Sequence, residues 1–198
     1  MKKIFVTIAF LIVIIGGGLW IWSQSSTKEG TGPVMPSADN TYSNETFGFS
    51  VSVPKGFTVN EAYLNQDLGP GREIPGVEFV IATSTAAGTN LSTDSHVAIE
   101  ELSDVDCTPS DFLDAPSKSV SMAIAGNAFT VASSSGAGAG NFYEETVYVT
   151  QKESRCYAVR YFIHSGNIHN YDPGAVKEFD RESLVNSFDA ITESLRLI

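Results

Sequence analysis

The chain has 198 residues, with 23 acidic side chains against 12 basic ones and a formal charge of −11 at pH 7. A protein of this charge repels a phosphate backbone, so no nucleic acid is expected as a partner. The length suits one domain with a short additional segment.

The first 22 residues predict a membrane anchor. Lys2 and Lys3 precede the run Ile4–Trp22, which has no ionisable side chain. As a helix this run would be about 28 Å long, close to the hydrocarbon thickness of a bilayer. The paired lysines favour an N-terminus in the cytoplasm and a chain that continues outside it. We therefore expect a transmembrane helix in residues 1–22, with the membrane as a partner through residues 4–22.

The segment that follows predicts a flexible linker. Residues 23–40 are rich in Ser, Thr, Gly and Pro, and a coil of this length has a mean end-to-end distance of about 25 Å. Residues 41–198 then form a single extracytoplasmic domain, periplasmic or at the cell surface. A cleaved signal peptide is the alternative to an anchor, because Gly16–Gly18 offers small residues at a processing site; the domain would then be secreted.

Cys107 and Cys156 are the only cysteines. In an oxidising compartment this pair predicts a disulfide. Closing a loop of about 50 residues stabilises a fold by roughly 4 kcal/mol in the loop-entropy model. A redox pair is the alternative, but the spacing lacks the C-x-x-C pattern of redox-active cysteines.

Several segments carry the apolar pattern of β-strands. Alternating, β-branched or aromatic residues predict strands at Phe47–Val53, Phe57–Asn60, Val77–Ile81, His96–Leu102, Val120–Ala125, Ala128–Ala132, Phe142–Thr150 and Arg155–Ile163. Gly126 and Asn127 predict a two-residue hairpin turn. A short helical turn is expected at Thr108–Asp111. Ser133–Gly140 has no large side chain to pack, so we expect a mobile loop there.

The end of the chain changes to a helical period. Its apolar residues recur at spacings of four, three and four, at Leu184, Phe188, Ile191 and Leu195. Asp180 is the expected N-cap. The predicted fold class is α+β: six to eight mostly antiparallel strands whose sheet is covered by this C-terminal amphipathic helix, preceded by the N-terminal transmembrane helix.

Two short patterns resemble a known family. The sequence reads Phe47-Gly48-Phe49-Ser50-Val51, then Pro54-Lys55-Gly56-Phe57, and closes with Ser187-Phe188-Asp189-Ala190-Ile191. It resembles the exported domains of the PsbP/Mog1-like group, as in membrane-anchored bacterial proteins. The resemblance implies an antiparallel sheet flanked by helices and an accessory or binding role, and it carries over no functional residue.

One turn-rich segment could bind a metal or small ligand. Two imidazoles and a carboxylate, from His164, His169 and Asp172, lie within nine positions and are suitable metal ligands. Ordinary loop structure is the alternative, because the asparagines and aspartate of this segment are also typical of turns.

A second acidic group offers hard oxygen ligands for calcium. Its residues are Glu100, Glu101, Asp104 and Asp106. The spacing is not that of an EF-hand loop, so a solvated acidic edge is the preferred interpretation.

The sequence lacks the patterns of the common catalytic sites. It has no G-x-S-x-G motif and no glycine-rich loop followed by Lys-Ser or Lys-Thr. We therefore expect a membrane-anchored accessory or binding domain without catalytic activity or cofactor, in contact with a protein or another envelope component. A metal- or small-ligand-binding module using residues 164–172 is the first alternative, and an envelope hydrolase the second.

Overall fold

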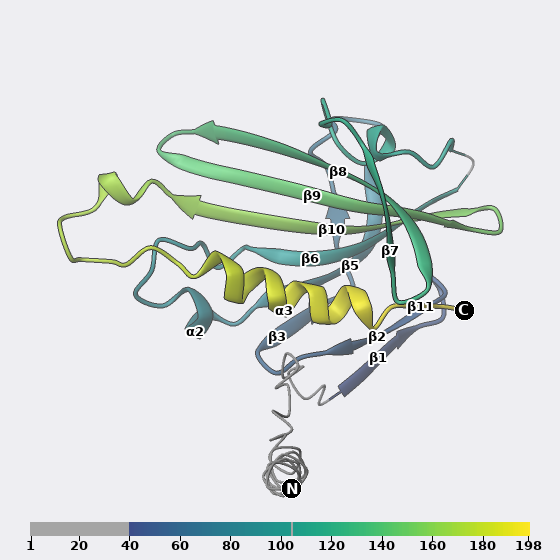
Figure 1. Ribbon diagram of the computed structural model, residues 1–198, viewed down its shortest axis with the longest axis horizontal. Helices are drawn as coiled ribbons and strands as arrows, with labels where there is room; N and C mark the ends of the chain where they lie inside the picture. Colours follow the sequence, from purple (N-terminus) through teal and green to yellow (C-terminus); the bar gives the residue numbers. More distant parts are fainter. Residues whose placement is uncertain (1–39, 104) are drawn as a thin grey trace, which may run out of the picture. The chain divides into compact units, whose positions relative to one another are not determined.

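The computed structural model describes residues 40–103 and 105–198 (Figure 1). The strands of this part, in chain order, are β1 (Asn40–Asn44), β2 (Phe49–Val53), β3 (Phe57–Asn60), β4 (Leu64–Asn65), β5 (Ile74–Ile81), β6 (His96–Ser103), β7 (Val120–Ile124), β8 (Asn127–Gly138), β9 (Asn141–Lys152), β10 (Arg155–Gly166) and β11 (Arg196–Leu197). The helical segments are α2 (Thr83–Ala86), the 3-10 turns η1 (Pro109–Asp111) and η2 (Ile168–Asn170), and α3 (Arg181–Glu193).

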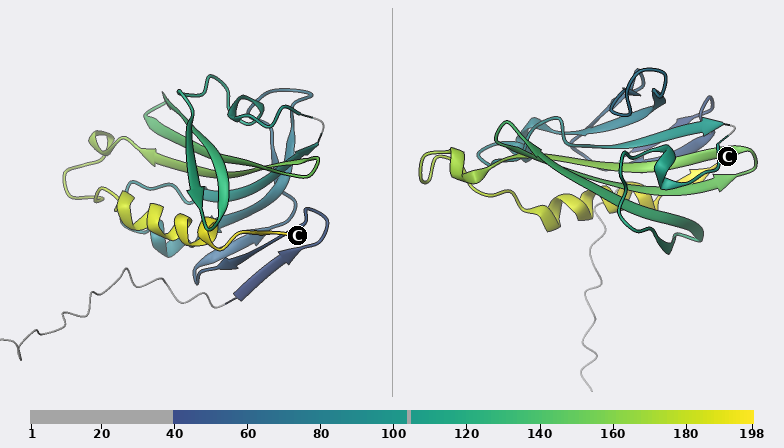
Figure 2. Two further views of the ribbon diagram at one scale, coloured as in Figure 1. Left: turned by 45° about the vertical axis from the view of Figure 1, so that its right-hand side comes forward. Right: turned by 90° about the horizontal axis from the view of Figure 1, so that it is seen from above.

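The strands form two antiparallel sheets. The larger sheet has the order β3-β5-β6-β10-β9-β8-β7, with β4 paired to β5, and the smaller has the order β1-β2-β11. β8, β9 and β10 each have 12 residues. They run side by side past the end of β6, whose pairing with β10 stops at Phe162 and His96 (Figures 1 and 2).

The two faces of the large sheet bury different cores. Val159, Tyr161 and Ile163 of β10 join a cluster that includes Leu184 and Phe188 of α3. We call this the helix face. The alternate residues of β10 point to the opposite face, where Ala158 joins a second cluster with Phe112 and Leu113 after η1. The period-two pattern of β10 therefore places neighbouring residues in separate cores.

The predicted C-terminal helix is present as α3. The carboxylate of Asp180 accepts the N–H of Ser183 at 2.9 Å, which caps the first turn. Leu184, Phe188 and Ile191 are buried on its inner side. Burial of each such side chain contributes about 1.5–3 kcal/mol, so tertiary packing holds this helix in place.

The predicted α+β class is wrong, because the fold is dominated by its sheets. α3 is the only helix longer than four residues in residues 40–103 and 105–198, and the large sheet extends well beyond it (Figure 2). The expected mobile loop at Ser133–Gly140 is also wrong: β8 continues to Gly138. Pairing with β9 holds this segment extended, although its small side chains contribute little packing.

The turn between β7 and β8 is one residue from its predicted place. Ala125 and Gly126 form it, both with positive φ, as a two-residue hairpin turn requires. The expected helical turn at Thr108–Asp111 is present as η1, where the N–H of Thr108 donates to the Asp111 carboxylate at 2.8 Å.

The predicted disulfide between Cys107 and Cys156 is confirmed, with 5.3 Å between the Cα atoms. It ties the segment before η1 to the first residues of β10, beside the core of the opposite face. The predicted anchor in residues 1–22 and the linker up to residue 39 lie outside the described residues. Among the described residues, no helix has the length and apolar character needed to span a bilayer.

Candidate binding edge

Among the described residues, half of β8 has a neighbouring strand on one side only. β7 pairs with Asn127–Val131 of β8, whereas β9 pairs with Thr130–Gly138. Ser133 is the last β8 residue with a backbone partner on its outer side: its carbonyl accepts the N–H of Ser117 at 2.8 Å, and its own N–H donates to the Ser117 hydroxyl at 3.0 Å. Within the described part of the chain, Ser134–Gly138 pairs with no strand on that side.

The period of the strand tells which backbone groups face outward. Because the N–H and C=O of Ser133 point away from β9, those of Ser135 and Ala137 do so as well. The turn between β8 and β9 supports this assignment. Gly138 pairs with Asn141 across a two-residue turn, and residues that flank such a turn hydrogen-bond to each other. The backbone groups of Gly138 therefore point toward β9, and those of the preceding residue, Ala137, point away from it.

The side chains of this segment do not protect the edge. Ser134–Gly138, which we call the open edge, consists of two serines, two glycines and an alanine. Natural sheets usually block such an edge with lysine, proline, a bulge or a covering loop. The open edge contains neither lysine nor proline, and most of its residues are exposed.

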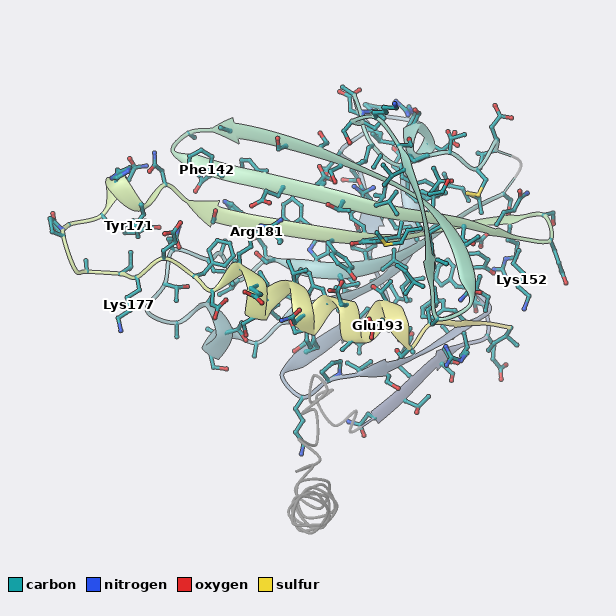
Figure 3. The ribbon with its side chains drawn as sticks, in the orientation of Figure 1. Phe142, Lys152, Tyr171, Lys177, Arg181 and Glu193 are labelled. Carbon is teal, nitrogen blue, oxygen red and sulfur yellow. A yellow bond between two sulfur atoms is a disulfide. The ribbon has the colours of Figure 1, made fainter. Side chains whose placement is uncertain are left out.

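On the helix face, β9 places an apolar ring beside the open edge. Phe142 pairs with Ala137 and is 45% exposed. The next β9 residue on this face, Glu144, accepts from Arg181 of α3 at 2.8 and 3.1 Å. Phe142 and Arg181 are labelled in Figure 3, where they lie on β9 and at the start of α3.

On the opposite face, β9 places a second ring beside the open edge. Tyr143 pairs with Gly136 on one side and His164 on the other. Its ring stacks on the imidazole of His164, with 4.6 Å between centroids and 24° between planes. Both carboxylate oxygens of Asp94 lie 2.9 Å from Nδ1 of His164. Burial would raise the pKa of Asp94, but hydrogen bonds from Ser92 and His164 outweigh it and hold the pKa below its ordinary value.

A buried ionic network lies further along this face. Arg160 is 2% exposed and Glu100 is fully buried; Nε of Arg160 donates to Oε1 of Glu100 at 2.8 Å and Nη2 donates to Oε2 at 3.1 Å. Arg160 also donates to Glu145 and to the carbonyl of Phe112. Burial alone would lower the pKa of Arg160, but Glu100 outweighs it and raises this pKa. The network joins β6, β9 and β10 to Phe112, the residue that follows η1.

This network corrects the sequence interpretation of the acidic residues. Glu100 was expected on a solvated edge, but it lies in the interior as the partner of Arg160. Glu101 pairs with Arg155 at 2.9 Å. Asp104 lies outside the described residues. The physical reason is the pairing of β6 with β10, which brings together residues 60 positions apart.

The three predicted ligand residues are placed separately. His164 is half-buried on β10 and bonded to Asp94, His169 is exposed on η2, and Asp172 is exposed beyond it. Asn167 accepts the N–H of His169 at 3.0 Å, as an asparagine in a turn does. In residues 40–103 and 105–198, no group of three or more His, Cys, Asp or Glu side chains is arranged to hold a metal ion.

Sequence reasoning missed the open edge and Tyr143. The signal that could have found them is the dipeptide Ala139-Gly140, which adopts positive φ at both positions and forms the turn between β8 and β9. Pairing outward from this turn aligns the small residues of β8 with the large ones of β9.

Comparison with known proteins assigns no family. No family model matches the chain, and no curated protein matches it. Among solved structures, a crystal structure of a protein from Bacteroides thetaiotaomicron VPI-5482, at 1.50 Å resolution, aligns with a TM-score of 0.48 and 11% sequence identity. The alignment covers 81% of this chain and 49% of that chain, so the match spans about half of the other protein. The resemblance to the PsbP/Mog1-like group stays a prediction.

Proposed function

We propose that residues 41–198 are an extracytoplasmic binding domain without catalytic activity, held at the membrane through residues 4–22. In this proposal, the domain binds an extended segment of an envelope protein, which adds to β8 as a further strand. The observation that carries the proposal is the open edge, whose outer side pairs with no strand of residues 40–103 and 105–198 and whose side chains are small and uncharged.

Strand addition uses backbone groups that the open edge already presents. Ser135 and Ala137 each offer an N–H and a C=O to an incoming strand, and main-chain bonds of this kind supply affinity in known strand-addition complexes. Each bond contributes about 0.5–1.5 kcal/mol net. Side chains of the arriving strand would alternate between the two faces, near Phe142 on one and Tyr143 on the other.

The charge of the chain favours a different protein over a second copy. Lys2 and Lys3 are the only charged residues before residue 23, so the remainder has 10 basic and 23 acidic side chains and a formal charge of −13. Two such domains repel each other when their edges approach. A basic segment from another protein is attracted instead.

The disulfide supports a location outside the cytoplasm. Cys156 is 2% exposed and bonded to Cys107, and bonds of this kind persist in oxidising compartments. The envelope is therefore the expected source of the partner.

The test compares two serine-to-proline variants. A display library of random nine-residue segments is selected on the full chain in detergent, and the tightest binder is labelled for fluorescence anisotropy. Ser135→Pro removes an outward N–H from the open edge and leaves a carbonyl of the arriving strand without its donor, which should weaken binding about five- to hundred-fold. Ser121→Pro is the matched control, because Ser121 also faces outward, but from β7.

The result expected is loss of binding in Ser135→Pro alone, with both variants melting as the wild type does. Equal binding by Ser135→Pro and the wild type would refute strand addition at β8. Concentration-dependent dimerisation that Ser135→Pro abolishes would instead identify a second copy as the occupant and refute the proposed partner.

A further inference from the structure

The ring of Tyr143 is covered by an imidazole on one side. His164 stacks on the side toward β10. The other side of the ring turns toward β8, where its pairing partner is Gly136. Asp94 fixes His164 in turn, so the ring is held in place before any partner arrives.

Gly136 leaves space on this face of β8. A Cβ built on Gly136 would have no heavy atom of the described residues within 4 Å, and the backbone there is not in the positive-φ region. Adjacent strands lie about 4.8 Å apart, so a long side chain from a strand added to β8 needs to cross only one strand to reach Tyr143. Residues opposite Gly136 would form a non-hydrogen-bonded pair with it, the arrangement in which side chains approach most closely.

The surrounding charge favours a cation in this space. Glu145 lies two residues along β9 on the same face, and the Asp94 carboxylate lies beyond His164. Glu145 already forms an ion pair with Arg160. A new cation would therefore be attracted by the negative charge of Glu145 without displacing Arg160. A planar guanidinium stacks flat on an aromatic face and also satisfies this charge. An ammonium ion is attracted to the ring face too, but it is more strongly hydrated and has no plane to stack.

We infer that the partner segment carries an arginine opposite Gly136, with its guanidinium stacked on the face of Tyr143 that is turned away from His164. The inference rests on the proposed function, because strand addition to β8 is what brings the arginine there. Gly136 thereby determines specificity: its missing side chain creates the space that the arginine fills.

The test is a scan of the selected nine-residue peptide. Arginine and glutamine are exchanged at each position in turn, and Kd is measured by anisotropy with the full chain. One position should favour arginine by about two- to thirty-fold, the range of cation–π contacts from exposed to desolvated sites. Gly136→Val should remove this preference while the peptide still binds, because the outward N–H groups of Ser135 and Ala137 remain.

Two further variants separate the interpretations. Gly138→Val makes the same change two residues along the same face, beside Asn141, and should keep the preference for arginine. Tyr143→Leu should lose it, which keeps the test decisive if valine at Gly136 disturbs β8.

Three outcomes are distinguishable. Binding that Ser135→Pro abolishes, with no position favouring arginine over glutamine, would overturn this inference and leave strand addition standing. A preference that survives both Gly136→Val and Tyr143→Leu would also overturn it. Binding that Ser135→Pro leaves unchanged would overturn the proposed function itself.

Discussion

Replacement of Arg160 by methionine should strongly destabilise the protein. The side chain fills a buried site between β6, β9 and η1, and it makes two hydrogen bonds to the fully buried carboxylate of Glu100. Methionine fills much of the volume but leaves that buried carboxylate without its cationic partner. Removal of one partner from a buried ion pair costs about 3–5 kcal/mol.

The remaining donors cannot replace the guanidinium. Tyr63 and Asn65 donate to the same oxygen of Glu100 at 2.9 and 3.1 Å, but both are neutral. The carbonyl of Phe112 also loses its donor from Arg160. For a domain of this size a loss of 3–5 kcal/mol corresponds to a fall in melting temperature of about 10 °C.

A double-mutant cycle measures how much of this cost is the unpaired charge. Urea unfolding gives the free energy of unfolding for the wild type, Arg160→Met, Glu100→Gln and the double variant. The double variant should be more stable than Arg160→Met, because the buried site no longer holds a charge. Additive losses, or an Arg160→Met variant within about 1 kcal/mol of the wild type, would refute the reasoning.

Three further predictions concern the core, the acid range and the disulfide. Phe188→Ala should cost about 3–5 kcal/mol in urea unfolding, since this ring is fully buried under α3; a loss below 1 kcal/mol would contradict the packing described. The lowered pKa of Asp94 means that its contribution to stability is complete above the ordinary aspartate pKa and is lost as the pH falls through the lower folded value. Melting temperatures of Asp94→Asn should therefore fall less steeply than those of the wild type in this acid range, and parallel curves would contradict the pairing. Replacement of both Cys107 and Cys156 by serine should cost about 4 kcal/mol, measured against the oxidised wild type; unchanged unfolding would show that the bond does not constrain the chain.

Elements with large alternating side chains could be predicted from the sequence. β3 was expected at Phe57–Asn60 and is found there, and β10 was expected from Arg155. Burial of every second residue on one face produces this pattern, so it is visible without the partner strand. Asp180 was likewise identifiable as a cap, because capping depends on residues close in sequence.

The open edge and its surroundings depend on distant residues. Ser134–Gly138 has no strand pattern of its own, and β9 determines that it is extended. His164 looked like a ligand because its partner, Asp94, lies 70 residues away. Glu100 looked solvated for the same reason, since the pairing of β6 with β10 is what buries it. A local sequence pattern does not reveal a contact between two residues that are distant in sequence and meet only through strand pairing.

The pairing of β11 with β2 has a consequence for the order of synthesis. Leu197 lies opposite Phe49, and the N–H of Ile198 donates to the carbonyl of Gly48, so residues 196–198 complete the smaller sheet. Among residues 40–103 and 105–198, β2 therefore acquires its second neighbour only when residues 196–198 have been made. We expect the smaller sheet to stay incomplete during synthesis until residues 196–198 have left the ribosome, and a chain without these residues to keep only β1 beside β2.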